Sequence, residues 1–393
     1  MRLKLAVTIL VFCVAALLSL GLVMLYSSMM ADRGSHYVKV QLLWAGLGVI
    51  CCATATFIDY QVLKRFALPL LTLSVALLVL VFVPPFGIHR NGASRWIGYH
   101  GVSFFQPSEV AKLVLIVVLA WYGERYQRQI TTFKKGILIP GLMISLVLGL
   151  IFREPDRGTT ILLAGVSATM LLTAGVRWRF IVPPILLGTV GLAFSLYRDP
   201  MRARRILSWW HLEENKSGVG YQAYEAMLAL GAGGWTGRGL GDSRQKLGFV
   251  PEHHTDFILS IIGEELGLIA TILVIVGFVL LVLCAIYIAT RAPDTFGMLL
   301  GSGIGFLIGL QALINIGVVT STLPNKGLPL PFISYGGSSL LLMLTSIGIL
   351  LSIARQAREP DPVEPRASSR NRNPVRQRNN PFKSPASGFA PNS

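Results

Sequence analysis

The chain alternates long apolar runs with short polar segments from its start to about residue 355. Each run approaches the roughly 20 residues that a helix needs to cross a bilayer. The pattern therefore predicts an all-α polytopic membrane protein with about ten transmembrane helices. The expected spans are 5–26, 38–58, 66–84, 107–122, 137–152, 158–175, 180–197, 257–287, 296–320 and 335–354.

Composition supports this class, because 53% of the residues are hydrophobic and 14% are charged, with a mean hydropathy of +0.61. Such values lie outside the range of soluble domains. The four cysteines fall inside apolar runs and suggest no disulfide framework or metal site. The net charge of +16 comes largely from loops and the C-terminal tail, so nucleic-acid binding explains it poorly.

The distribution of Lys and Arg sets the expected orientation. These residues are more frequent in the short loops on the N-terminal side of the predicted membrane, which favours a cytoplasmic location for both termini. We expect a membrane domain over residues 1–355 and a disordered, basic cytoplasmic tail over 356–393. From Arg355 onward, eight Lys and Arg stand against three acids, which suits an anionic inner leaflet.

A large extracytoplasmic loop, about 198–255, separates the seventh and eighth predicted helices and ends at Asp256. A carboxylate at the mouth of a membrane helix is costly to place and often functional. An alternative is that Asp256 caps the helix, since Asp at that position satisfies free N–H groups. The spacing by itself does not decide between the two interpretations.

Two further polar segments lie on the same predicted side. The first contains Arg95 and then Glu109 and Lys112, which are three residues apart on one helix face. These two charges could simply neutralise each other, although intramembrane charges more often mark a pathway. The second segment, 153–160, contains Glu154 and Asp156 between two arginines.

The last polar segment, 323–339, is rich in proline and glycine and contains Lys326, Ser334 and Ser338. Backbone of this kind is tolerated at membrane depth where it lines a cavity. Together the segments predict a cationic, water-filled cavity with one carboxylate, Asp256. Such a cavity suits a lipid-linked anionic substrate, since cations hold phosphate and a carboxylate can act as a base.

Several segments resemble the signatures of the SEDS family of cell-wall proteins, whose members include FtsW, RodA and SpoVE. They are Phe105–Lys112, Glu154–Thr159, His254–Ile258 with Gly263–Gly267, and Leu330–Ser339. The resemblance runs in order over about residues 5–355. The Lys-Gly pair at Lys326 is closer to the division type, FtsW, than to the elongation type, RodA. Arg157 and Asn325 depart from the family pattern, and Arg157 makes the local charge pattern less regular.

The resemblance implies a peptidoglycan glycosyltransferase that polymerises lipid II at the outer face of the inner membrane during septal cell-wall synthesis. It assigns Asp256 as the general base, with inversion and departure of polyprenyl pyrophosphate. Arg95, Lys112 and Lys326 are candidates to stabilise the pyrophosphate, and Glu109 and Asp156 to orient them. The further candidate substrate-binding residues are Glu154, His254, Thr255, Ser334 and Ser338.

A divalent cation, Mg²⁺ or Mn²⁺, is a candidate cofactor because it could stabilise the leaving pyrophosphate, although the sequence identifies no ligands for it. The expected partners are a class B penicillin-binding transpeptidase and other division proteins. Three alternatives remain open: a lipid II flippase, a scaffold that recruits the transpeptidase, and a RodA-like elongation polymerase. Polymerisation of purified lipid II separates an enzyme from a flippase or a scaffold.

Overall fold

In the computed structural model, helices occupy all the positions at which the apolar runs predict them. The structure describes residues 2–29, 36–84, 86–90, 93–99, 102–198, 204, 207–210, 214, 218, 220–246, 255–325 and 327–357. The helices of the predicted spans are α1 (Leu3–Met29), α2 (His36–Phe57), α4 (Ala67–Leu80), α5 (Pro107–Arg125), α6 (Ile139–Arg153), α7 (Arg157–Thr173), α8 (Trp178–Tyr197), α11 (Ile258–Thr290), α12 (Thr295–Val319) and α13 (Gly337–Gln356).

Shorter helical elements join some of these spans. They are α3 (Gln61–Arg65), the 3-10 helix η1 (Gln127–Gln129), the π-helical turn η2 (Lys134–Leu138) and α10 (Tyr221–Ala232). α10 lies inside the long loop that separates α8 from α11. Of the described helices, seven are long and apolar enough to cross a membrane. α4 and α7 are shorter apolar helices and α5 carries charged residues, so the count of ten spans stays a prediction.

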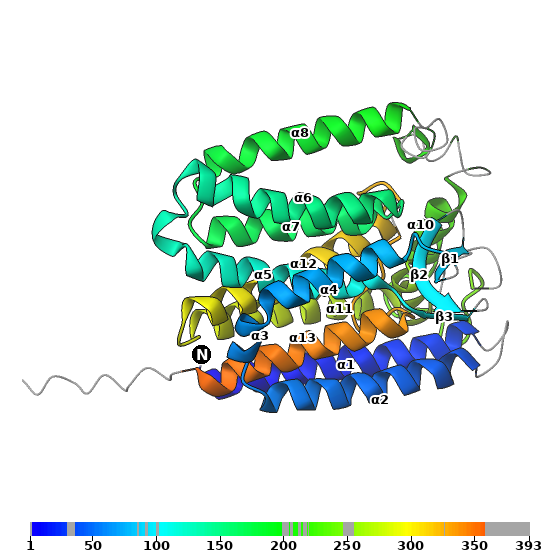
Figure 1. Ribbon diagram of the computed structural model, residues 1–393. Helices are drawn as coiled ribbons and strands as arrows, with labels where there is room; N and C mark the ends of the chain where they lie inside the picture. The colour runs from blue at the N-terminus through cyan, green and yellow to red at the C-terminus, as the bar shows by residue number, and fades with distance from the viewer. Residues whose placement is uncertain are drawn as a thin grey trace, which may run out of the picture. The chain divides into compact units, whose positions relative to one another are not determined.

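The long helices run side by side, and the first turn of α1 and the last turn of α13 lie at the same end (Figure 1). α12 and α5 form the centre of the bundle: α12 contacts α5, α7 and α11, and α5 also contacts α4. Their close approach depends on small residues, as is usual for helices packed in a membrane. At Gly303 of α12, for example, a Cβ would lie 2.6 Å from the side chain of Ile116 on α5.

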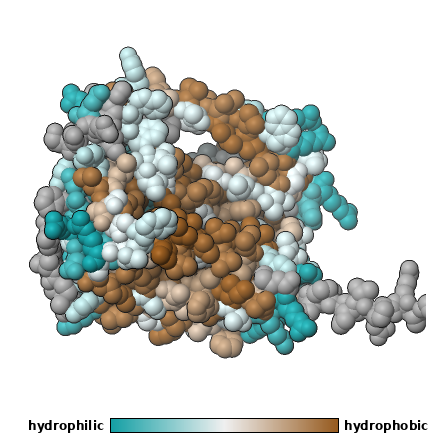
Figure 2. All heavy atoms as spheres, turned by 180° about the vertical axis from the view of Figure 1, so that it is seen from behind, coloured by the Kyte–Doolittle hydropathy of each residue, from teal (hydrophilic) through white to brown (hydrophobic). Residues whose placement is uncertain are grey.

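The outer surface of the bundle is apolar around its middle, with hydrophilic side chains gathered toward both ends (Figure 2). Large side chains are exposed there, among them Phe12, Leu43 and Leu187 at 71%, 70% and 74%. Water would make such a surface unstable, whereas lipid tails match it. The structure therefore supports the multi-pass arrangement that the sequence predicts.

One element was not anticipated from the sequence, which predicts an all-α fold. A small antiparallel sheet in the order β1–β2–β3 joins α4 to α5. Its strands are β1 (Gly87–Arg90), β2 (Ala93–Tyr99) and β3 (Val102–Phe105), with Ile88 opposite Trp96 and Ile97 opposite Phe105. The sheet lies at the same end of the bundle as α10 (Figure 1). We call this end the loop end, and it is the end where Asp256 lies.

Candidate active site

Asp256 lies in a turn that leads into α11 and is half-buried. α11 starts at Ile258, and its N-cap residue is Phe257, whose side chain makes no capping hydrogen bond. Asp256 therefore precedes the N-cap residue by one position. Its place just ahead of the helix agrees with the sequence prediction.

The backbone around Asp256 is held by two buried side chains, one from α12 and one from the segment that precedes α13. Asn315 of α12 donates from Nδ2 to the carbonyl oxygen of Asp256 at 2.8 Å and to that of Leu328 at 2.7 Å. Ser334 Oγ donates to the carbonyl oxygen of Thr255 at 2.5 Å and accepts from the backbone N–H of Leu330 at 2.8 Å. One amide and one hydroxyl thus tie the Asp256 turn to residues 328–334.

The carboxylate of Asp256 faces the chain at Gly327. A side chain at this position would place its Cβ 2.7 Å from Asp256 Oδ2, closer than Cβ atoms ordinarily approach. The neighbouring candidate Lys326 and the candidate His254 lie outside the described residues. The proline- and glycine-rich segment therefore passes directly beside the carboxylate.

Glu109 and Lys112 form an ion pair on the first turns of α5, with Nζ and Oε2 2.8 Å apart. Both side chains are almost fully buried, at 5% and 1% exposure. Lys112 Nζ also donates to Gln311 Oε1 at 3.1 Å, and Gln311 Nε2 donates to the carbonyl oxygen of Pro329 at 2.8 Å. The pair is therefore bonded, through Gln311, to the same proline-rich segment that Asn315 holds beside Asp256.

Arg95 and Glu154 meet in a second cluster at the loop end. Arg95, on β2, donates from Nε to the carbonyl oxygen of Glu154 at 3.3 Å and from Nη2 to that of Pro155 at 2.7 Å. The Glu154 side chain is fully buried, and its two carboxyl oxygens have no hydrogen-bond partner among the described residues. Burial, and next the charge of Asp156, raise the pKa of Glu154 to about 8, while Arg95 opposes the shift.

Asp156 and Arg157 both have structural partners at the start of α7. Asp156 is the N-cap and accepts from the backbone N–H and hydroxyl of Thr159 at 3.2 and 2.9 Å. Arg157, which departs from the family pattern, donates from Nη2 to Ser195 Oγ of α8 at 2.6 Å. Arg157 therefore joins α8 to the bundle, which gives this unusual residue a structural role.

Ser338 is buried in the first turn of α13. The same region is supported by α2, since Gln41 donates from Nε2 to the carbonyl oxygen of Ser334 at 3.4 Å and accepts from the backbone N–H of Gly336 at 3.3 Å. The structure thus brings Glu109, Lys112, Thr255, Asp256 and Ser334 into one hydrogen-bonded assembly.

Sequence reasoning missed the residues that connect this assembly, Gln311 and Asn315. They are four residues apart in an otherwise apolar helix, so they share one face. Uncharged polar residues at such spacing in a membrane helix often bond across helices. That signal was available in the sequence.

Comparison with known proteins identifies the family of the chain. The family model described as cell cycle protein (FtsW, RodA, SpoVE) matches residues 7–359. A protein of Trichlorobacter lovleyi, named a probable peptidoglycan glycosyltransferase FtsW, is 43% identical over 355 residues, which cover 88% of this chain and 92% of the relative.

Two solved structures share the fold. One chain comes from a peptidoglycan synthase complex described as coordinating polymerization and crosslinking; it has a TM-score of 0.73 at 27% identity, covering 88% of this chain and 96% of that chain. The rod shape determining protein RodA of Thermus thermophilus has a TM-score of 0.66 at 27% identity, covering 89% and 97%. The chain therefore belongs to the FtsW/RodA/SpoVE family of multi-pass membrane proteins, as its sequence motifs predict.

Proposed function

We propose that the protein is a peptidoglycan glycosyltransferase that polymerises lipid II into glycan strands. The observation that carries the proposal is the fixed position of Asp256, whose backbone is bonded to Asn315 and whose carboxylate faces Gly327. Family membership and the FtsW relatives support the same activity.

In the proposed reaction, Asp256 removes the proton from the acceptor sugar hydroxyl, and the resulting oxygen attacks the anomeric carbon of the donor. The bond to polyprenyl pyrophosphate breaks with inversion at that carbon. A positioned general base contributes about 10²–10⁴-fold to the rate. The Asp256 backbone, held at two successive carbonyl oxygens, gives the base a defined position.

The departing pyrophosphate needs positive charge. We assign this role to Arg95 and Lys326, and we give Lys112 a supporting role because Glu109 compensates its charge at 2.8 Å. The raised pKa of Glu154 keeps this carboxyl largely protonated at neutral pH, so Glu154 leaves the charge of Arg95 largely uncompensated. The polar candidates His254, Thr255, Ser334 and Ser338 complete the proposed lining.

A divalent cation stays a proposal without assigned ligands. Among the described residues there is no group of three or more His, Cys, Asp or Glu that could hold a metal. We therefore derive no step through a metal. The proposed charge compensation relies on side chains of the chain itself.

The expected setting is the division septum of a bacterial inner membrane, with both termini in the cytoplasm. A class B penicillin-binding transpeptidase is the proposed partner, supported by the structural similarity to a peptidoglycan synthase complex. The chain is 43% identical to the FtsW relative and 27% identical to RodA of Thermus thermophilus, which favours the division role over elongation. Co-purification with elongation proteins in place of septal ones would contradict that assignment.

The experiment that tests the activity uses the purified full chain with its transpeptidase partner in detergent micelles. We expect it to convert labelled lipid II into glycan strands that are resolved on a gel. Micelles have no two compartments, so a flippase would have no measurable activity in this assay. Absence of glycan, together with lipid II transfer across vesicles by the same preparation, would overturn the proposal in favour of a transporter.

A further inference from the structure

The helix that follows Asp256 is interrupted shortly after it begins. α11 spans Ile258–Thr290, but Gly267 has a φ of 80°, in the left-handed region that favours glycine. The break separates residues 258–266, which we call the α11 stub, from the long remainder of the helix. Asp256 lies two positions before the first residue of the stub, so the orientation of the stub sets the direction in which the Asp256 turn projects.

Backbone groups of the loop fill this break. In an unbroken helix the N–H groups of Leu268 and Ile269 would donate four residues back, to the carbonyl oxygens of Glu264 and Glu265. The four groups instead pair with the loop. Leu268 N and Ile269 N donate to Gly234 O and Trp235 O at 2.9 and 3.3 Å, and Glu264 O and Glu265 O accept from Arg238 N and Gly239 N at 3.0 Å each.

This exchange gives partners to these four backbone groups, which would otherwise be left unpaired at the break. The approach is close: a Cβ at Gly237 would lie 2.2 Å from the carbonyl oxygen of Glu265, so position 237 admits no side chain. The loop therefore completes the backbone hydrogen bonds of α11 at the break. A displacement of the loop would break these bonds and allow the stub to move.

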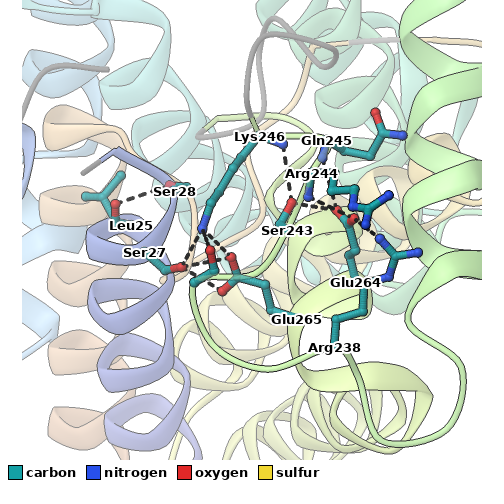
Figure 3. A network of polar contacts seen from close by, with 11 residues as sticks. Leu25, Ser27, Ser28, Arg238, Ser243, Arg244, Gln245, Lys246, Glu264 and Glu265 are labelled. Atoms are coloured by element: carbon teal, nitrogen blue, oxygen red, sulfur yellow. Dashed lines mark hydrogen bonds and ion pairs between the residues drawn. The ribbon is translucent and has the colours of Figure 1, made fainter. Parts of the chain in front are cut away.

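A buried ion pair locks the loop in place at the end of the stub (Figure 3). Lys246 Nζ lies 2.8 Å from Glu265 Oε1, and it also donates to the carbonyl oxygen of Gly241 at 2.7 Å. Ser27 of α1 donates to both carboxylate oxygens of Glu265, at 2.8 and 2.6 Å. The exposed fractions of Lys246 and Glu265 are 5% and 1%. One side chain of the stub thus joins the loop and α1.

Its neighbour Glu264 holds the same loop through a different set of contacts. Its carboxylate accepts from the Ser243 hydroxyl and from the backbone N–H groups of Arg244 and Gln245 at 3.0 and 3.4 Å. Arg238 adds an ion pair to Glu264 at 3.7 Å. The carboxylates of two consecutive buried glutamates of the stub, Glu264 and Glu265, therefore both bond to the loop.

We propose that the Lys246–Glu265 ion pair positions Asp256 for catalysis by fixing the α11 stub against the loop and α1. This inference rests on the proposed function of Asp256 as the base. Both residues act on Asp256 through the helix, so they are positioning residues and not catalytic ones. A misplacement of about 1 Å can cost about 100-fold in rate, so a small rotation of the stub would be sufficient to reduce turnover.

The energetics of buried ion pairs supply a sharp test. Removing one partner leaves a buried charge uncompensated, whereas replacing both by neutral groups of similar shape is often close to neutral. Lys246→Met and Glu265→Gln are near-isosteric, and Gln can still accept from Ser27. A positioning role therefore predicts that the double variant recovers activity that each single variant loses.

The measurement is kcat and KM for lipid II polymerisation by the full chain with its transpeptidase partner. We expect each single variant to lose about tenfold or more in kcat with KM within about twofold of the wild type, and the double variant to return to within about threefold. A double variant as slow as the slower single variant would overturn the proposal, because it would show that the charges themselves are needed. Single variants with unchanged kcat would also overturn it.

Controls separate this result from loss of fold and from failure of the proposed function. Lys64→Met removes an ion pair with Glu124 on the far end of α5 and should leave kcat unchanged. If the single variants cannot be purified folded, Ser27→Ala, which leaves both charges paired, should still lower kcat severalfold. An unchanged kcat would contradict the positioning role of the Lys246–Glu265 ion pair. Activity in Asp256→Asn would refute the proposed base, whatever the variants at Lys246, Glu265 and Ser27 show.

Discussion

Asn315 offers the most direct way to disturb the position of Asp256 without changing Asp256 itself. Its Nδ2 donates to two carbonyl oxygens, those of Asp256 and Leu328, and the side chain is 1% exposed. Replacing it with Ala removes the donor and leaves a small space. Replacing it with Asp keeps the shape but, when ionised, turns an acceptor toward the two carbonyl oxygens.

The size of the effect follows from these two bonds. A buried polar group that loses its partner costs about 1–3 kcal/mol, so the loss at two carbonyl oxygens is about 2–6 kcal/mol in local free energy. The Asp256 turn and residues 328–334 would relax to regain partners. Because a shift of about 1 Å can lower a rate about 100-fold, we expect both variants to lose about 10- to 100-fold in kcat.

The relative rates of the two variants distinguish the loss of the hydrogen-bond donor from the loss of side-chain volume. If the lost donor matters, Asn315→Asp is at least as slow as Asn315→Ala, whereas if the space matters, the isosteric Asp variant is faster. The assay is lipid II polymerisation with the transpeptidase partner, accompanied by thermal unfolding in detergent to confirm folded protein. Polymerisation by Asn315→Asp at the wild-type rate would refute the view that this amide positions the base.

Three further predictions concern the surroundings of the site. Gly327→Ala should lower kcat at least about tenfold with little change in melting temperature, because the new Cβ would lie 2.7 Å from Asp256 Oδ2; an unchanged kcat would contradict this geometry. Lys112→Met should abolish polymerisation by leaving Glu109 unpaired, and adding Glu109→Gln should restore part of the activity. No recovery in the double variant would indicate that Lys112 contacts the pyrophosphate. Glu154 has a folded-state pKa of about 8 against an ordinary 4.5, so its neutral form stabilises the fold fully below pH 4.5, and this stability declines as pH rises and is lost above 8. Unfolding measured over this range should show a fall of up to about 1.4 kcal/mol per pH unit that Glu154→Gln removes; an equal fall in the variant would refute the assignment.

The helices could be predicted from the sequence because hydrophobic runs of spanning length are a local signal. The predicted start at residue 107 coincides with the first residue of α5, where Pro107 suits the first turn. The position of Asp256 just ahead of α11 was also predictable, since the polar segment meets the apolar run there. Function followed from motifs that are long and clustered.

Other features depend on contacts between distant parts of the chain. Glu265 bonds to Lys246, which is 19 positions away in the sequence, and to Ser27, which is 238 positions away. No local sequence pattern predicts such contacts. The small sheet is different, because the Asn-Gly pair at 91–92 between its first two strands is a hairpin signal. There the assumption of an all-helical fold outweighed a cue that the sequence contained.

The central claim is that the carboxylate of Asp256 is the base of a polymerisation reaction, and Asp256→Asn tests it most directly. Asn keeps the shape of the side chain but cannot accept the proton, while the backbone bonds from Asn315 and Ser334 remain available. Polymerisation of labelled lipid II is measured for both proteins with the same transpeptidase partner and with melting temperatures compared. The account predicts glycan strands from the wild type and none from the folded variant. Glycan formation by the variant at the wild-type rate would contradict it.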